Sequence, residues 1–223
     1  MLVINKYVIF ATKFNVYGNK QRYVKSVNQR RSGTYKIVYL DFDDERLLGM
    51  QPTAYNRIAN LLKASGVNTT TSSVIDYVNF AKEACLIFSL ENYASKFAEK
   101  NTVKKHYFTD NGLLSIFLTG GETSLLENLC AIYLYQKFGD GLYFYNKNIE
   151  VDFFVAERKY AVQVSYSIAD EETRNREVRA LEKLNEFLPL QKSVIVTYEE
   201  EENITLPGGQ VVEVIPAWKW LLE

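Results

Sequence analysis

The chain has 223 residues, a length that suits one large domain or two small ones. Hydrophobic residues make up 47% of it, enough for a sizeable core, and the formal net charge of −1 excludes a global field that would attract nucleic acid. No apolar run reaches the roughly 18 residues of a membrane span, and the first residues lack a signal-peptide layout. We therefore expect a cytoplasmic protein with no membrane partner.

Residues 1–50 form a basic segment that is rich in strand-forming side chains. Residues 1–40 hold eight Lys or Arg and no acidic residue. Leu2–Thr12 and Lys36–Phe42 are rich in Val, Ile, Tyr and Phe, which favours strands. We expect a β-rich N-terminal segment.

Residues 51–118 have the pattern of a winged helix-turn-helix. A first helix is expected over Pro52–Gly66, since proline fits a first turn and glycine a helix end. The polar run Asn68–Ser73 supplies the cap of a second helix. Apolar residues then follow at i, i+3, i+4 and i+7, namely Val74, Tyr77, Val78 and Ala81. Strand-like runs come next, at Ala84–Leu90 and Lys105–Thr109.

This unit offers few basic side chains to DNA on its second helix, where Lys82 is the only one. The hairpin is the better candidate for phosphate contact, and a solvated charged face is the alternative. Its basic residues are Lys96, Lys100, Lys104 and Lys105.

Three further residues are expected to be structural. His106 is the single histidine of the sequence, and one histidine makes no zinc site. Cys85 and Cys130 lie in apolar stretches without CxxC spacing, so we expect two buried thiols rather than a zinc site or a disulfide framework.

Residues 119–223 alternate helices and strands. A helix over Glu122–Phe138 is apolar around most of its surface, which predicts that it is buried. Asp170 is the expected cap of a second long helix, and the terminal Trp218, Trp220, Leu221 and Leu222 are expected to pack the chain end down. Strands are expected at Leu142–Tyr145, Ile149–Val155, Tyr160–Tyr166, Ser193–Tyr198 and Val211–Ile215.

Polar residues stand at unusual places in these elements. Asp152 lies in the middle of an apolar strand, and Glu127 is the lone acid in the middle of the apolar helix. Such carboxylates need a partner, an ion or water. Gln163 and Ser165 share one face of the next strand by the period of two, against Asp152. Arg176 and Glu177 frame the edge of the same site or form a surface ion pair.

The stretch Glu127–Ser165, together with KKHYFTDNGL, DEETRNRE and the terminal IPAWKWLLE, resembles the C-terminal domain of a bacterial and archaeal AAA-type ATPase family. That domain is similar to PD-(D/E)XK nucleases, and the resemblance covers roughly residues 52–223. It implies that Glu127 is the acid of the core helix and Asp152 the metal-binding Asp. Gln163 then stands at the Asp or Glu of the (D/E)XK motif, and Ser165 at its Lys.

The last two positions depart from the family pattern. Gln163 offers a carbonyl oxygen to Mg²⁺ but no charge, and Ser165 supplies no cation. Lys147 and Lys159 are candidate substitutes for the lysine that spacing alone does not support. A degenerate metal site of Glu127, Asp152 and Gln163 is therefore expected.

The N-terminal segment resembles a remnant of the family's ATPase domain. Residues 29–33 read QRRSG, but the Lys-Ser/Thr pair that meets phosphate and Mg²⁺ is not in register behind them. The rest of an ATPase core has no room before residue 51. ATP hydrolysis is not expected.

We therefore expect an α/β chain in which residues 1–50 are a basic ATPase remnant, 51–118 a winged-helix domain, and 119–223 a PD-(D/E)XK restriction-endonuclease-like mixed sheet flanked by helices. The expected function is a DNA- or protein-binding module with an inactive nuclease-like domain. The alternatives are a Mg²⁺-dependent DNA endonuclease that uses Glu127 and Asp152, and an assembly element that self-associates. Mg²⁺ is the only candidate cofactor.

Overall fold

The computed structural model describes residues 51–64, 66–96, 103–117 and 121–223, together with four short strands in the first fifty residues. Those strands pair as two antiparallel hairpins, β1 (Leu2–Ile4) with β2 (Tyr7–Ile9) and β3 (Gln29–Arg30) with β4 (Gly33–Thr34). The strand expected at Lys36–Phe42 lies outside the described residues.

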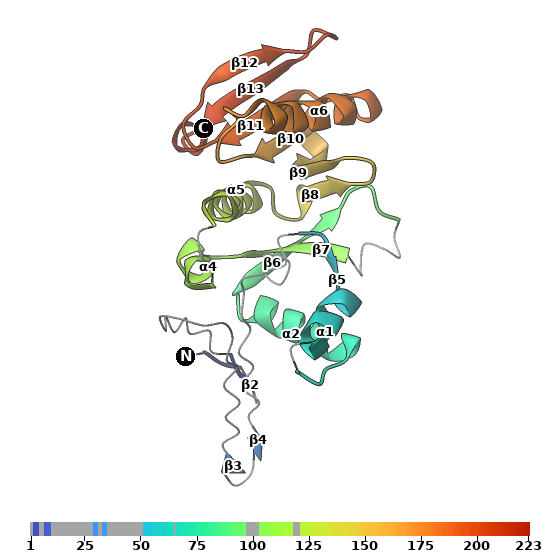
Figure 1. The fold of residues 1–223 in the computed structure, drawn as a ribbon, viewed down its shortest axis with the longest axis vertical. Coiled ribbons are helices and arrows are strands. Elements are labelled where there is room, and N and C mark those ends of the chain that lie inside the picture. The colour runs from blue at the N-terminus through green and yellow to red at the C-terminus, as the bar shows by residue number, and fades with distance from the viewer. Residues whose placement is uncertain are drawn as a thin grey trace.

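A nine-stranded mixed sheet organises the described chain, in the order β12-β13-β11-β10-β9-β8-β6-β7-β5 (Figure 1). β10, β11 and β13 run parallel to one another, whereas β8, β9 and β10 pair antiparallel. The predicted α/β class with a mixed sheet is confirmed. The strands are β5 (Thr53–Ala54), β6 (Ile87–Asn92), β7 (Val103–Phe108), β8 (Leu142–Asn146), β9 (Glu150–Val155), β10 (Tyr160–Val164), β11 (Lys192–Thr197), β12 (Glu202–Thr205) and β13 (Val211–Pro216).

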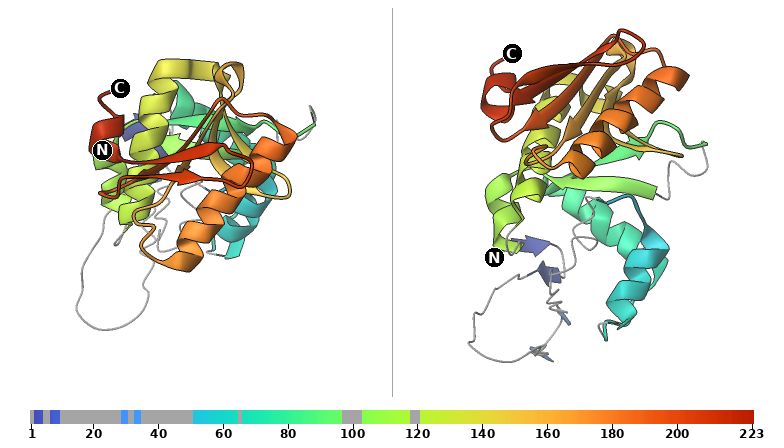
Figure 2. Two further views of the ribbon diagram at one scale, coloured as in Figure 1. Left: turned by 90° about the horizontal axis from the view of Figure 1, so that it is seen from above. Right: turned by 45° about the horizontal axis from the view of Figure 1, so that its top comes forward.

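Helices cover both faces of this sheet (Figure 2). The helix α5 packs on the face that holds Val162 and Val194, whereas α6 packs on the opposite face with Ala161 and Ile195. β10 and β11 are therefore buried on both sides, which explains their nearly continuous apolar sequence. The helices are α1 (Tyr55–Ala64), α2 (Thr71–Glu83), α4 (Asn111–Phe117), α5 (Glu122–Phe138), α6 (Glu171–Phe187) and α7 (Ala217–Trp220), with short 3₁₀ turns at Gly139–Gly141 and Ala156–Arg158.

The sheet is continuous across the expected boundary between residues 118 and 119. β6 runs parallel to β8, with Glu91 opposite Tyr143 and Asn92 opposite Phe144. The Asn92 side chain strengthens this junction, because its Nδ2 donates to the carbonyl of Asn146 at 2.6 Å and its Oδ1 accepts from the amide of Asn146 at 3.0 Å. The hairpin β6–β7 is thus part of the same sheet as β8–β13.

Several predicted element ends are wrong, each for a local reason. The first helix begins at Tyr55 rather than near Pro52, because Thr53 and Ala54 pair with β7 as β5. The strand expected from Ala84 begins at Ile87, and the short helix α4 and the strand β12 are additional. At the chain end Trp220 is buried as expected, but Trp218 and Leu222 are 64% and 82% exposed.

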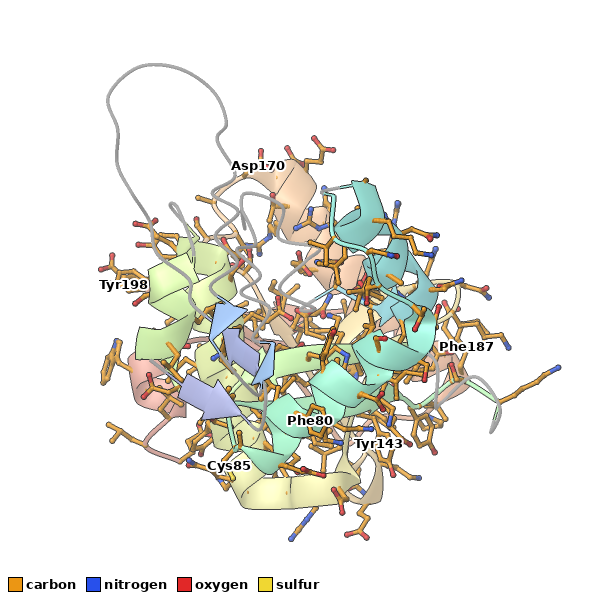
Figure 3. All side chains as sticks on the ribbon, turned by 90° about the horizontal axis from the view of Figure 1, so that it is seen from below. Phe80, Cys85, Tyr143, Asp170, Phe187 and Tyr198 are labelled. Atoms are coloured by element: carbon orange, nitrogen blue, oxygen red, sulfur yellow. The ribbon has the colours of Figure 1, made fainter. Side chains whose placement is uncertain are left out.

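Cys85 was expected to be buried and is exposed (Figure 3). It follows α2 with a φ of 55°, the left-handed conformation that commonly ends a helix. Its amide donates to the carbonyl of Lys82, and the amide of Leu86 donates to the carbonyl of Ala81, so the residue closes the helix instead of starting a strand. Cys130 is buried on α5 as predicted, and both thiols are free.

Candidate functional site

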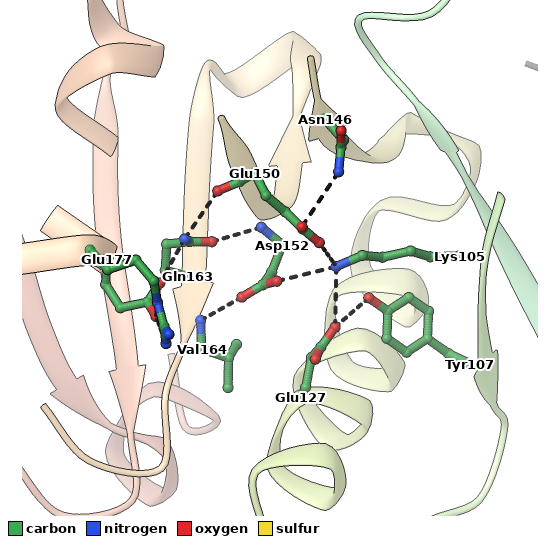
Figure 4. Close-up of polar contacts among 10 residues, drawn as sticks. Lys105, Tyr107, Glu127, Asn146, Glu150, Asp152, Gln163, Val164 and Glu177 are labelled. Atoms are coloured by element: carbon green, nitrogen blue, oxygen red, sulfur yellow. Dashed lines mark hydrogen bonds and ion pairs between the residues drawn. The ribbon is translucent and has the colours of Figure 1, made fainter. Parts of the chain in front are cut away.

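The two acids that the sequence singled out, Glu127 on α5 and Asp152 on β9, lie close together. They are found where the pairing of β9 with β10 ends, on the side that faces α5. The resemblance placed Glu127 and Asp152 in one pocket, and the structure brings their side chains to one charge centre (Figure 4). The Glu127 side chain is 13% exposed and that of Asp152 is 16% exposed. Ser165 is not bonded to this centre, because its Oγ donates to the carbonyl of Ser167 at 2.8 Å.

The link between the two acids is Lys105 on β7, whose side chain has no exposed surface. Its Nζ lies 3.0 Å from Glu150 Oε1, 3.2 Å from Asp152 Oδ1 and 3.5 Å from Glu127 Oε1. We call Lys105, Glu127, Glu150 and Asp152 the charge cluster. The expectation that Lys105 is a surface lysine for phosphate contact is therefore wrong.

The position of Lys105 follows from the alternation of side chains along β7. Lys105 and Tyr107 share the face that meets α5 and β9, whereas Lys104 and His106 point to the other face. The sequence KKHYF showed this alternation, but it did not show which face would be covered. The position of Lys105 two residues before Tyr107, an aromatic residue suited to a core, was the signal that could have placed the lysine on the covered face.

Tyr107 completes the surroundings of Glu127, because its hydroxyl donates to Glu127 Oε1 at 2.7 Å. Burial raises the pKa of Glu127 to about 7, with the ammonium of Lys105 opposing the rise and the charge of Asp152 adding to it. For Lys105, burial would lower the pKa, but the carboxylates of Glu127, Asp152 and Glu150 outweigh burial and raise it. The lysine is therefore a permanent cation in this cluster.

Gln163 has a structural role at the point where the β9–β10 ladder ends. Its Oε1 accepts from the amide of Asp152 at 2.7 Å, and its Nε2 donates to the carbonyl of Glu150 at 3.3 Å and to Glu177 Oε2 at 2.8 Å. Asp152 Oδ2 in turn accepts from the amide of Val164 at 3.0 Å. Two side chains thus continue the pairing of the strands and fix the orientation of Asp152.

Glu177 lies behind Gln163 on α6. Its Oε1 accepts from Arg176 at 2.7 Å, and both residues line the adjoining cleft, so the ion pair and the pocket-edge position expected from the sequence occur together. Burial raises the pKa of Glu177, as does the charge of Asp152, while Arg176 opposes the change. Glu177 therefore adds to the concentration of negative charge behind the cluster.

The residues expected to bind Mg²⁺ do not fit the ion in this arrangement. The ammonium of Lys105 fills the space between the carboxylates, and the Gln163 oxygen is engaged by a backbone amide. Across residues 51–64, 66–96, 103–117 and 121–223, no group of three or more His, Cys, Asp or Glu is placed to hold a metal ion. Lys147 and Lys159 are exposed in turns flanking β9, and neither takes part in the ion pairs of the charge cluster.

A cleft of about 1680 Å³ opens beside the cluster, between α5, the β9 and β10 strands, and α6 as far as Lys183. Its lining includes Glu127, Glu150 and Asp152, and in total eight acidic and three basic residues. Such a surface repels the phosphates of a nucleic acid. The three basic residues are Arg176, Arg179 and Lys183.

His106 lies on the other face of β7, away from the charge cluster. Its Nδ1 and the Oγ of Ser89 are 2.8 Å apart, and its ring stacks on Tyr55 at a centroid distance of 5.9 Å. Its Nε2 is buried without a hydrogen-bond partner in the described part of the chain. The residue is a buried component of the packing between β7 and α1, in keeping with the structural role expected for it.

The chain is similar to a protein whose own function is uncharacterized. The chain is 31% identical to the Uncharacterized protein MJ1544 of Methanocaldococcus jannaschii over 176 residues, which is 74% of this chain and 40% of that protein. No family model matches the sequence, and no solved structure matches it. No helix in the described ranges has the length and apolar character needed to cross a membrane.

Proposed function

We propose that the chain is a binding module whose nuclease-like unit is inert. The observation that carries the proposal is the buried ammonium of Lys105 between Glu127, Glu150 and Asp152. Metal-dependent phosphodiester cleavage needs carboxylate oxygens that are free to hold a divalent ion and an activated water. In this centre those oxygens are already bonded to a cation of the chain.

The order of elements supports the resemblance to the AAA-type ATPase family with a PD-(D/E)XK-like C-terminal domain. Residues 122–197 run helix, three antiparallel strands, helix and parallel strand, with the two acids on the first helix and the second strand. Residues 53–108 run strand, two helices and hairpin, and β5 pairs with β7, an order of elements similar to that of a winged helix. We assign the two units on this ground.

The charges favour a protein partner over DNA. The cleft is predominantly acidic, and α2 carries Asp76 and Glu83 beside its single base, Lys82. The helix is nonetheless open to a partner, because Val74 is its one buried residue among the described side chains, and Ile75 is 38% exposed. A partly exposed helix that carries an apolar side chain on its surface and little positive charge suits a protein surface better than a phosphate backbone.

The decisive experiment measures DNA cleavage and DNA binding by the same protein. Supercoiled plasmid and labelled duplex are incubated with the parent and with Asp152→Ala in Mg²⁺ and in Mn²⁺. We expect no cutting by the parent above the level of the variant, because Lys105 already occupies the carboxylates. Cutting by the parent that the variant lacks would instead establish the nuclease that uses Glu127 and Asp152.

Fluorescence anisotropy with duplex and single-stranded DNA then decides the partner class. Binding that weakens steeply with added salt would show a DNA-binding module, because phosphate contacts release counterions. We expect flat curves at all salt concentrations, in line with the acidic cleft. Size-exclusion chromatography with light scattering over a dilution series separates self-association from binding of another protein.

A further inference from the structure

The charge cluster is built around a cation, although the cation belongs to the chain. The carboxylates converge on one fully buried nitrogen from two elements, Glu127 from α5 and both Glu150 and Asp152 from β9. Lysine is almost never fully buried unless its charge is paired. One ammonium faces three carboxylates here, so the protein has placed more negative charge around this point than the lysine neutralises.

The ligand set around Lys105 Nζ has the chemistry of a hard divalent ion. Carboxylate oxygens are the groups that Mg²⁺ and Mn²⁺ prefer in proteins. The oxygens stand 3.0 to 3.5 Å from the nitrogen, as hydrogen-bond acceptors do, whereas Mg²⁺ holds its ligands at about 2.1 Å. The lysine therefore keeps the carboxylates at a spacing that a bound metal would shorten.

The carboxylates of the charge cluster can be reached from solvent. Glu127, Glu150 and Asp152 all line the large cleft beside α6, whereas the Lys105 stem enters from the opposite side, along β7. The Glu150 side chain is 39% exposed and can turn toward an incoming ion. Asp152 is held in place by the amide of Val164, so at least one ligand is oriented before any metal binds.

We propose that the ammonium of Lys105 takes the place of a divalent cation among Glu127, Glu150 and Asp152, so that replacing this lysine by an uncharged side chain turns the cluster into a Mn²⁺ or Mg²⁺ site. The inference rests on the proposed function in one respect, namely that the natural centre is inert. It identifies the cause of that inertness as an internal cation rather than the loss of the carboxylates.

The test is calorimetric titration of Mn²⁺ into the full chain, without DNA, for the parent, Lys105→Met and Lys104→Met. Methionine keeps the length of the lysine stem without its charge, and Lys104 is the neighbouring residue that pairs with Glu91 on the other face of β7. We expect Lys105→Met to bind one Mn²⁺ at least tenfold more tightly than the other two proteins. Asp152→Asn added to Lys105→Met is expected to abolish that binding.

Equal Mn²⁺ affinity in the parent and Lys105→Met would overturn the proposal, as would binding that survives Asp152→Asn. If Lys105→Met is unfolded without metal, circular dichroism with added Mn²⁺ decides: recovery of the folded spectrum supports the proposal. Failure of both Lys105→Met and Lys105→Gln to bind Mn²⁺ or to refold with it overturns it. Cleavage of DNA by the parent would overturn the proposed function and this inference with it, whereas equal Mn²⁺ affinity without any cleavage would overturn the inference alone, so the two failures are distinguishable.

Discussion

His106 should make the folded state sensitive to acid. Burial lowers the pKa of His106 to about 4 from its usual 6.5, and the charges of Lys82 and Lys104 add to the effect. Because the folded-state pKa lies below the unfolded-state pKa, folding favours the neutral ring. The full stability is therefore present above pH 6.5 and is lost as the pH falls toward 4. Between about pH 7 and pH 4.5 the loss amounts to about 2.5 kcal/mol, at about 1.4 kcal/mol per pKa unit.

The assay is urea unfolding of the parent and of His106→Phe over this pH range. Phenylalanine keeps a ring against Tyr55 but cannot take up a proton, and it loses the bond to Ser89, which costs about 1 kcal/mol at every pH. Carboxylates titrate in both proteins, so the difference between the two stability curves isolates the single histidine of the sequence. Parallel curves from pH 7 to pH 4.5 would refute the reasoning.

Three other substitutions test the site and its support by urea unfolding. Lys105→Met should lower the free energy of unfolding by about 3 to 5 kcal/mol, because it leaves buried carboxylates without their cation. The control Lys104→Met should lower it by about 1 kcal/mol or less. Similar losses in the two variants would contradict the paired role of Lys105. Gln163→Leu should lower the free energy of unfolding by about 2 to 4 kcal/mol, since it leaves the buried polar partners of Gln163 unsatisfied. A smaller loss would argue against the role of Gln163 in joining β9 to β10. Trp220→Phe should cost about 1 to 2 kcal/mol through its lost hydrogen bond, with Trp218→Phe, 64% exposed, as the near-neutral control.

The two acids of the site could be found from the sequence because each interrupts an apolar element. A lone Glu127 in a buried helix and an Asp152 inside a buried strand both demand a partner, and the structure supplies one to each. The strands of residues 142–216 other than β12 were likewise predictable, since β9, β10 and β11 are apolar over most of their length.

The partner itself could not be predicted, because it comes from a distant strand. Lys105 is 47 positions before Asp152, and local periodicity carries no information on which strands of a sheet become neighbours. The same limit hid the two-residue strand β5, which exists only through its pairing with β7. The exposed position of Cys85 could not be predicted for a different reason. The left-handed backbone conformation that ends the helix there is expected of glycine or asparagine rather than of cysteine.

The parallel pairing of β6 with β8 has a practical consequence for dissecting the protein. Expression of residues 121–223 alone would leave the hydrogen-bonding edge of β8 bare, and bare edges recruit other chains. The same fragment would carry Glu127, Glu150 and Asp152 but not Lys105, so its folding would depend on acid or on an added cation. We therefore expect residues 121–223, which look like a separate domain in the sequence, to aggregate when they are expressed alone.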